Sequence, residues 1–136
     1  MSQLACDIVT PQAKLFSEEV YTVIVPGIEG EMGFLEGHAP LVSVLSDGVV
    51  RLRKENGADM QSFALQGGYV EVTGRKVIVL ADRACAVADI DVEQVRAEAD
   101  EAKAEIEALS DDNAAARSTL QSTVLWCELR LKAAQA

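Results

Sequence analysis

Residues 27–40, which read GIEGEMGFLEGHAP, contain the residue types best suited to chemistry or binding. They include four glycines, three glutamates and His38, the only histidine of the chain. The stretch has no hydrophobic period, and glycine supplies backbone angles that other residues avoid, so we predict a loop here. Such a loop could hold a phosphate, bind a metal ion or contact another protein.

The residues in this stretch disfavour most of the chemical alternatives. A phosphate site is disfavoured because no Gly-Lys-Ser/Thr sequence occurs and the glutamates would repel an anion. One histidine is too few for a cupin-like metal centre, and it would be the only imidazole base for nucleophilic catalysis. An acidic, glycine-rich surface for a basic protein partner and an ordinary surface loop both remain open.

The composition of the chain narrows the classes of partner. Acidic residues outnumber basic residues by 22 to 12, the formal net charge is −10, and 4% of residues are aromatic, which argues against nucleic acid and anionic lipid. No secretory signal is expected, and no run approaches the roughly 20 apolar residues that span a bilayer. Membrane association is therefore expected only through another protein. Cys6, Cys85 and Cys127 are expected to be buried, reduced thiols, because each lies among apolar residues.

The N-terminal part of the chain, residues 1–88, has the period of β-strands. Short β-branched runs alternate with a period of two and are separated by turn signals. Asn56-Gly57 is the strongest hairpin signal, with both turn residues expected at positive φ. Gly67-Gly68 is expected to separate two further strands. The pattern predicts an antiparallel sandwich or barrel of about ten short strands.

The C-terminal part, residues 89–136, has the period of helices. One apolar stripe recurs at Val92, Val95, Ala99, Ala102, Ile106 and Leu109, and a second at Ala116, Leu120, Val124, Cys127, Leu131 and Ala134. Asp91 is expected to cap the first helix, with Gln94 as its return partner. Residues 110–113 favour a turn, so the two helices should form an antiparallel hairpin. Because the stripes are mostly alanine and valine, the seam should be thin.

The segment at residues 26–41, PGIEGEMGFLEGHAPL, resembles a signature of the ε subunit of bacterial F-type ATP synthases, whose mitochondrial homologue is the δ subunit. Only Glu36 departs from it, where the family often has proline. Similar runs follow the family's order along essentially the whole chain: DIVTP at 7–11, GVVR at 48–51, GGYVEV at 67–72 and VLAD at 79–82. The resemblance implies an α+β fold, an N-terminal β-sandwich followed by a C-terminal helical hairpin.

The resemblance also implies a noncatalytic central-stalk, or rotor, subunit that binds the γ subunit and the ring of c subunits and couples proton flow to ATP synthesis. The ring's polar loops are basic in that family, which suits acidic contact residues. The expected c-ring contacts are Glu29, Gly30, Glu31 and His38. The expected γ contacts, on one sheet face, are Thr10, Val42 and Ser43. The resemblance implies a peripheral position on the cytoplasmic side of the bacterial inner membrane, within the complex.

Regulation by the hairpin is a further property that the resemblance implies. In many members the hairpin inhibits ATP hydrolysis by contacting the α and β subunits of the catalytic head, and in some a nucleotide holds it compact. The nucleotide motif has arginine three residues after Asp91, where this chain has Gln94. Arg96 comes two residues later, about 200° around the helix. Asp91 and Arg96 are thus the only candidates for ATP binding, which is disfavoured, and no cofactor is expected.

The charge of the helices bears on inhibition. They are mainly acidic, whereas insertion into the acidic surface of the catalytic head would favour basic helices, so we expect a compact and weakly inhibitory hairpin. Two alternatives remain. One is a nucleotide-sensing inhibitory subunit of the same complex, and the more remote one is a stand-alone small sandwich enzyme or ligand-binding module.

Overall fold

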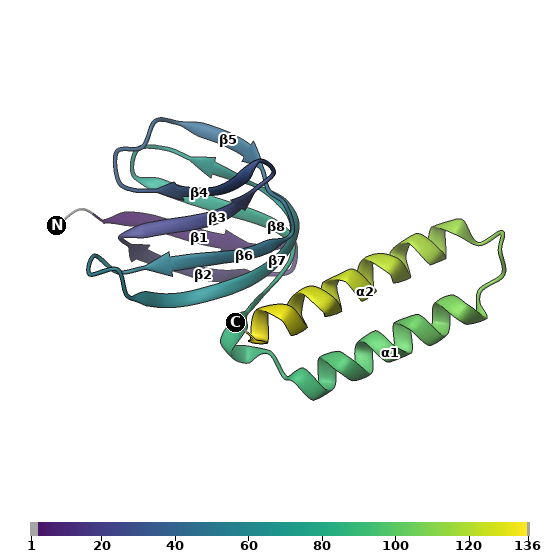
Figure 1. The fold of residues 1–136 in the computed structure, drawn as a ribbon. Coiled ribbons are helices and arrows are strands. Elements are labelled where there is room, and N and C mark those ends of the chain that lie inside the picture. Colours follow the sequence, from purple (N-terminus) through teal and green to yellow (C-terminus); the bar gives the residue numbers. More distant parts are fainter. Residues whose placement is uncertain (1–2, 136) are drawn as a thin grey trace. The chain divides into compact units, whose positions relative to one another are not determined.

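A computed structural model describes residues 3–135 and divides the chain into two compact units, residues 1–88 and residues 89–136 (Figure 1). The first unit is built from strands and the second from helices. The strands are β1 (Leu4–Val9), β2 (Lys14–Val20), β3 (Thr22–Gly27), β4 (Gly30–Phe34), β5 (Leu41–Val44), β6 (Gly48–Arg53), β7 (Asp59–Val72) and β8 (Lys76–Ala86). A short 3₁₀ turn, Val87–Asp89, precedes the helices α1 (Val92–Ala108) and α2 (Ala114–Gln135).

The strands pair in the order β2-β1-β8-β7-β6-β3-β4, and β5 pairs with β7. This confirms the predicted β-sandwich followed by a helical hairpin, with eight strands among the described residues where about ten were expected. The pairing is antiparallel except between β1 and β8, which run parallel. Nearly the whole domain lies between these two strands in sequence, so no tight turn imposes an antiparallel direction on them.

The Gly67-Gly68 pair lies inside β7 and does not separate two strands. β7 pairs with β6 before the glycines and with β5 after them, while β8 pairs with its other side from Phe63 to Val72. The two glycines have φ of 67° and 119°, and a Cβ on Gly68 would overlap the carbonyl oxygen of Leu80. The glycine pair therefore lets one long strand bend, which is visible in the curvature of β7 and β8 in Figure 1.

The core of the first unit consists of large apolar side chains on alternate strand positions. The largest fully buried ones are Phe34, Phe63, Leu4, Ile8, Leu52 and Leu65. The rings of Phe16 and Phe63 meet edge to face with centroids 5.7 Å apart. Because successive side chains of a strand face opposite sides, the period of two in the sequence becomes this buried layer.

The turn between β6 and β7 differs from the one predicted for Asn56-Gly57. Only Gly57 has positive φ, at 84°. The Gly57 N–H donates to the Lys54 carbonyl at 2.9 Å, and the Lys54 N–H donates to the Ala58 carbonyl at 2.9 Å. The Asn56 side chain accepts from the Ala58 N–H at 3.0 Å, so it stabilises the turn without leaving the right-handed region. The connection is longer than a two-residue turn, and only its glycine takes the left-handed conformation.

A charged group on β1 ties this strand to both neighbours. Asp7 is almost fully buried; its Oδ1 accepts from the Ser17 hydroxyl of β2 at 2.8 Å, and its Oδ2 lies 3.2 Å from the Lys76 Nζ and 3.6 Å from the Lys14 Nζ. Desolvation by itself would raise the pKa of Asp7, but the Ser17 hydrogen bond and the two lysines outweigh it and hold the pKa below its ordinary value. The carboxylate therefore favours the folded state while it is ionised.

The two helices pack along the predicted stripes. Val95 and Ala99 of α1 are buried against Cys127 of α2, with Ile90 and Leu131 packed beside them. The predicted N-cap is confirmed, because the Asp91 carboxylate accepts from the Gln94 N–H at 3.2 Å. Within residues 3–135, no helix combines the length and the apolar character required to cross a membrane.

A charged contact joins α1 to α2. The Arg130 Nη2 lies 2.6 Å from the Glu98 Oε2 and 3.4 Å from the Cys127 Sγ, and the guanidinium lies 5.0 Å from the centre of the Trp126 ring. Desolvation alone would lower the pKa of Arg130, yet the Glu98 carboxylate raises it. The Arg130 Nε is buried without a partner among the described residues, so Glu98 carries most of the compensation for this charge.

The environment of the cysteines was predicted correctly for two of the three. None of these three cysteines forms a disulfide; Cys6 and Cys127 are buried, whereas Cys85 is partly exposed. Burial, with a smaller contribution from the Asp7 charge, raises the pKa of Cys6 to about 12. Cys6 is therefore an unreactive core residue.

Candidate interaction surface

The acidic, glycine-rich segment is mostly a β-hairpin, which corrects the prediction of a loop over residues 27–40. β3 and β4 pair from Val23 opposite Phe34 to Gly27 opposite Gly30, with Ile28 and Glu29 at the turn. Only residues 35–40 lack regular structure. Met32 and Phe34 face inward from this strand, but the glycines between them and beside them interrupt the hydrophobic period of two, so the pattern does not predict a strand.

Glycine is required at the base of this hairpin. Gly30 has φ of 129°, and a Cβ on Gly27 would lie against the Gly30 carbonyl oxygen and the Met32 methyl group. These constraints hold the turn residues Ile28 and Glu29 at a fixed, exposed position, with Ile28 65% exposed. We call residues 27–30 the hairpin tip.

His38 lies at the other end of β4 from the hairpin tip. Its ring packs edge to face on Phe34, with centroids 4.9 Å apart, and its Nδ1 lies 2.7 Å from the Ala39 carbonyl oxygen. Since a carbonyl only accepts hydrogen bonds, Nδ1 carries the proton in this contact. β4 spans five residues, or about 14 Å between its ends. The structure therefore brings Glu29, Gly30 and Glu31 together but leaves His38 apart from them.

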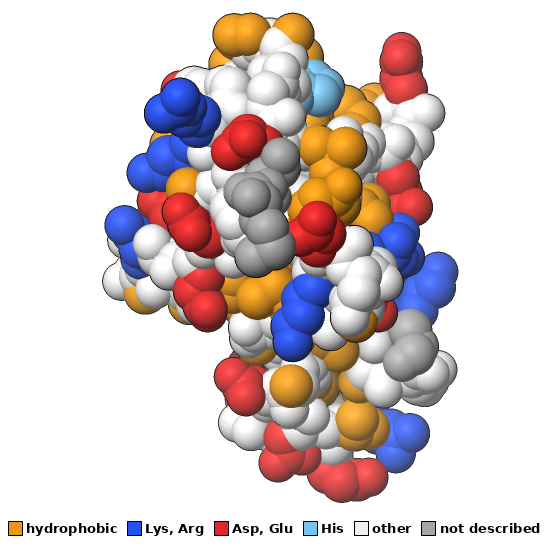
Figure 2. Space-filling view, turned by 90° about the vertical axis from the view of Figure 1, so that its left-hand side faces the viewer, with side chains coloured by type: hydrophobic (Ala, Val, Ile, Leu, Met, Phe, Trp, Pro, Cys, Tyr) orange, Lys and Arg blue, Asp and Glu red, His pale blue; other side chains and the backbone are white. Residues whose placement is uncertain are grey.

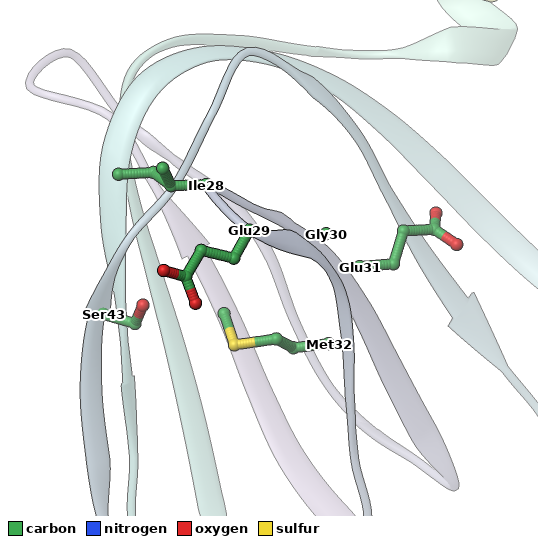
Figure 3. A pocket seen from close by; sticks show the side chains of 7 residues that line it. Ile28, Glu29, Gly30, Glu31, Met32 and Ser43 are labelled. Carbon is green, nitrogen blue, oxygen red and sulfur yellow. The ribbon is translucent and has the colours of Figure 1, made fainter.

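A hollow of about 370 Å³ lies beside the hairpin and is lined by residues 27–32 and by Ser43 of β5. Figure 3 shows the side chains of Glu29 and Met32 extending toward the side of Ser43, whereas Glu31 extends to the opposite side. The two neighbouring carboxylates of the hairpin therefore face different surroundings.

Glu31 has a partner that the sequence did not suggest. Nη2 of Arg51, on β6, donates to both carboxylate oxygens of Glu31 at 2.8 and 2.7 Å. The side chains are 59% exposed for Glu31 and 33% for Arg51. The pair spans β3, which lies between β4 and β6, and depends on strand register that a local sequence pattern does not reveal.

The three predicted γ contacts do not share one environment. Val42 is 67% exposed on β5, whereas the next residue, Ser43, is partly buried and lines the hollow beside the hairpin. Consecutive residues of a strand face opposite sides, so Val42 and Ser43 lie on different sides of β5. That both contact γ stays a prediction. Thr10 is 8% exposed, and its hydroxyl bonds within the β1–β2 turn to the Ala13 carbonyl oxygen at 3.3 Å.

Exposed apolar side chains do gather on one face of the sandwich. Val44 is paired in register with Tyr69, Tyr69 with Leu80 and Leu80 with Val9, across four strands. We call this row, with Val42, the outer apolar face. Thr10 borders it, because Thr10, Tyr69 and Leu80 line a common hollow of about 330 Å³. Figure 2 shows how groups of hydrophobic side chains reach the surface between acidic ones.

The two residues considered for ATP binding have local partners. Asp91 caps α1, and the Arg96 Nη1 lies 3.2 Å from the Glu93 Oε1. The absence of a nucleotide site at Asp91 and Arg96 remains a prediction. In the described part of the chain, His, Cys, Asp and Glu side chains form no group of three or more that could hold a metal ion.

Comparison with known protein families identifies the family of the β-sandwich. Residues 3–87 match the sequence model described as "ATP synthase, Delta/Epsilon chain, beta-sandwich domain". The chain belongs to this family.

Relatives in the family extend the likeness beyond the sandwich. The ATP synthase epsilon chain of Campylobacter curvus is 38% identical over 120 residues, covering 88% of this chain and 92% of that one. That of Dehalococcoides mccartyi is 44% identical over 112 residues, covering 82% and 76%. Among solved structures, a chain in the cryo-EM structure of the Euglena gracilis mitochondrial ATP synthase, with OSCP, F1 and c-ring, matches all of this chain and 83% of its own length. Its TM-score is 0.73 and its identity 26%.

Proposed function

We propose that this chain is the noncatalytic central-stalk subunit of an F-type, proton-translocating ATP synthase. In this role it binds the γ subunit and the c-ring and helps couple proton flow to ATP synthesis. The observation that carries the proposal is membership of the delta/epsilon family, by the match over residues 3–87 and the likeness to epsilon chains over most of the length.

The hairpin tip is the proposed contact with the c-ring. It is exposed, its backbone is fixed by glycines, and it carries Glu29 beside the apolar Ile28. An acidic protrusion of this kind suits the basic polar loops expected of the ring. His38 then supports the shape of the adjoining turn through Phe34 and lies away from the tip itself.

The outer apolar face is the proposed contact with γ. Val42, Val44 and Tyr69 are exposed, and contiguous exposed apolar side chains are typical of protein interfaces. Thr10 contributes the shape of the β1–β2 turn at the border of this face, because its hydroxyl is already bonded. Ser43 belongs with the hairpin side of β5 and not with this face.

The hairpin of α1 and α2 is proposed to remain mainly compact and to inhibit ATP hydrolysis weakly. The Glu98–Arg130 pair and the Val95–Cys127 contact favour the closed form, and the many glutamates of α1 disfavour insertion into an acidic catalytic head. Any contact with the α and β subunits would be made through these helices. The complex would hold the chain peripherally, on the cytoplasmic side of a bacterial inner membrane.

Reconstitution tests the main proposal. Rotor particles of γ and c-ring, purified from the same organism and stripped of this subunit, should retain the added chain through gel filtration. Added back to the stripped whole enzyme, the chain should restore ATP-driven proton pumping. A chain that passes through unbound and restores no pumping would contradict the proposal.

Deletion of residues 89–136 tests the proposed weak inhibition. The truncated chain should restore pumping, and the ATP hydrolysis rate of the enzyme should change by less than about twofold, because a compact hairpin does not contact the catalytic head. A several-fold activation would contradict weak inhibition without affecting the proposed stalk role.

A further inference from the structure

The turn between β6 and β7 contains a residue pair that can modify itself. We propose that Asn56-Gly57 is a site of spontaneous deamidation, at which the Asn56 side-chain amide is replaced by a carboxylate without an enzyme. The chain has one other asparagine, Asn113, and we expect it to stay intact under the same conditions. This inference concerns the chemistry of the β6–β7 turn and does not depend on the proposed function.

The reaction begins when the main-chain nitrogen of Gly57 attacks Cγ of Asn56. The nitrogen gives its proton to solvent, a new N–Cγ bond forms, and Nδ2 takes up a proton and leaves as ammonia. Water then opens the resulting succinimide ring. Cleavage of the bond from the Gly57 nitrogen to Cγ gives aspartate, and cleavage of its bond to the Asn56 main-chain carbonyl carbon gives isoaspartate. Water is the only co-reactant, and no group is oxidised or reduced.

The turn leaves both reacting groups accessible. Every residue of the segment 54–59 is exposed, so water can reach the ring. A Cβ on Gly57 would have no heavy atom within 4 Å apart from its neighbours in the chain, and glycine lacks the side chain that would hinder its nitrogen. The Ala58 N–H donates to Asn56 Oδ1 at 3.0 Å, and a donor at this oxygen stabilises the negative charge that develops on it during the attack.

One hydrogen bond restrains the reaction in the folded turn. The Gly57 N–H donates to the Lys54 carbonyl oxygen at 2.9 Å, and the attack on Cγ requires this bond to break. Because the turn is exposed and buries no side chain, it should open locally far more often than the sandwich core unfolds. The reaction in the folded chain should therefore be slower than in an unfolded chain but still measurable.

Asn113 is held in a different way. It precedes Ala114, the first residue of α2, whose methyl group hinders an attack by its own nitrogen. The Asn113 carbonyl oxygen accepts from the Arg117 N–H at 3.1 Å, and its Oδ1 accepts from the Ala116 N–H at 3.4 Å. Both bonds belong to the first turn of α2, so the attack would disrupt the start of the helix. The structure therefore favours modification at Asn56 over Asn113.

The two products should affect the turn differently. Aspartate keeps an oxygen at the position of Asn56 Oδ1, so the bond from the Ala58 N–H can persist. Isoaspartate inserts a methylene group into the main chain, which lengthens the turn and separates Lys54 from Gly57 and Ala58. Both products add a negative charge beside Glu55.

The test follows the freshly purified full-length chain at mildly alkaline pH, where the Gly57 nitrogen loses its proton more readily. Proteolysis and mass spectrometry at intervals report the conversion of amide to carboxyl at Asn56 and at Asn113 in the same sample. Conversion at Asn56 should be at least about tenfold faster than at Asn113, because only the glycine nitrogen reaches Cγ without hindrance, and it should be faster still in urea.

A second measurement identifies isoaspartate. An isoaspartate-specific methyltransferase with S-adenosylmethionine should label the incubated chain, whereas the Asn56→Ser variant, which keeps a side-chain oxygen in the turn, is the matched control and should accept no label. The amides of Lys54 and Gly57 should exchange hydrogen faster in the labelled chain than in the fresh chain. Asn56→Asp, which reproduces the other product, should leave their exchange nearly unchanged.

Three outcomes would contradict the inference. Asn56 that stays intact in the folded chain while it is converted in urea would overturn it. Equal conversion at Asn56 and Asn113 would also overturn it, because the turn would then confer no selectivity. Equal rates in the folded chain and in urea would refute the restraint assigned to the hydrogen bond between Gly57 and Lys54.

Discussion

The two units of this chain are stabilised in different ways. The sandwich buries phenylalanine, leucine, isoleucine and valine from many strands, most of them with no exposed area. The hairpin buries fewer residues: Val95, Ala99 and Ala102 from α1, and Trp126, Cys127 and Ala133 from α2. Because buried apolar area scales with side-chain size, the sandwich has many redundant contacts and the hairpin has few. We therefore expect the helical hairpin to open at a lower free energy than the sandwich.

The hairpin partly compensates for its thin seam with charge. Arg130 contacts Glu98 across the seam and both Trp126 and Cys127 on its own helix, so one side chain joins three neighbours. Such an attachment depends on one charged partner, whereas the sandwich core is held by many large apolar side chains. The following predictions test this contrast, beginning with the largest effect.

Truncating a buried side chain should lower the free energy of unfolding more in the sandwich than in the helical hairpin. Phe63→Ala should lower the free energy of unfolding by about 3–5 kcal/mol, because a fully buried ring is replaced by a cavity. Val95→Ala should cost about 2 kcal/mol, since two methyl groups are lost from a small seam. Urea unfolding followed by hydrogen exchange of the strand amides reports the sandwich. Fluorescence of Trp126, the only tryptophan, reports the hairpin.

The control for both truncations is Val42→Ala. This side chain is exposed on the outer apolar face, so the change should cost less than about 0.5 kcal/mol. If Val95→Ala lowered the free energy of unfolding as much as Phe63→Ala does, the two units would not differ in how their cores stabilise them.

Removal of the charge at Glu98 should loosen the hairpin alone. Glu98→Gln leaves the largely buried Arg130 without its counter-charge, and should lower hairpin stability by about 1–2 kcal/mol. Trp126 fluorescence during urea unfolding measures this, and the sandwich signal should not move. Glu101→Gln, one turn further along α1 and exposed, is the matched control. Equal effects of the two changes would mean that the Arg130 contact contributes nothing specific.

Asp7 should give the sandwich a stability component that depends on pH. Because its pKa is lowered on folding, its contribution is fully present above about pH 4, the ordinary range of aspartate, and is lost as the pH falls through the lowered pKa. Asp7→Asn should therefore cost up to about 1 kcal/mol at pH 7 and almost nothing at pH 2. Urea unfolding at both values measures it.

The control for Asp7 is Asp59→Asn, which removes an exposed ion pair with Arg53 and should have little effect at either pH. A cost of Asp7→Asn that is the same at pH 2 as at pH 7 would show that the side chain acts by packing and not by charge.

Much of the fold follows from hydrophobic period. The change from a period of two to steps of three and four near residue 89 predicts the two kinds of secondary structure, and both helical stripes are at least partly buried in the structure. Strand pairing cannot be predicted from the hydrophobic period, because register depends on contacts between residues far apart in sequence. The parallel β1–β8 pair and the continuous strand through Gly67-Gly68 are examples. The type of the Asn56-Gly57 turn depended on loop length, which the dipeptide does not fix.

The candidate surface was predictable in part. The family signature located the hairpin tip, but it grouped His38 with Glu29 although β4 separates them. Alternation along a strand could already have placed Val42 and Ser43 on opposite sides. Arg51 could not have been found as the partner of Glu31, since they are 20 residues apart and meet only through the pairing of β3 with both β4 and β6.

The parallel pairing of β1 with β8 has a consequence for biosynthesis. Strand β1 emerges from the ribosome about 70 residues before β8, which is one of its two neighbours, since Ala5 aligns with Lys76. A nascent chain stalled before that point exposes an unpaired β1 edge that another copy can join. The sandwich therefore closes only when β8 emerges, whereas the contacts between the two helices are local and do not depend on β1.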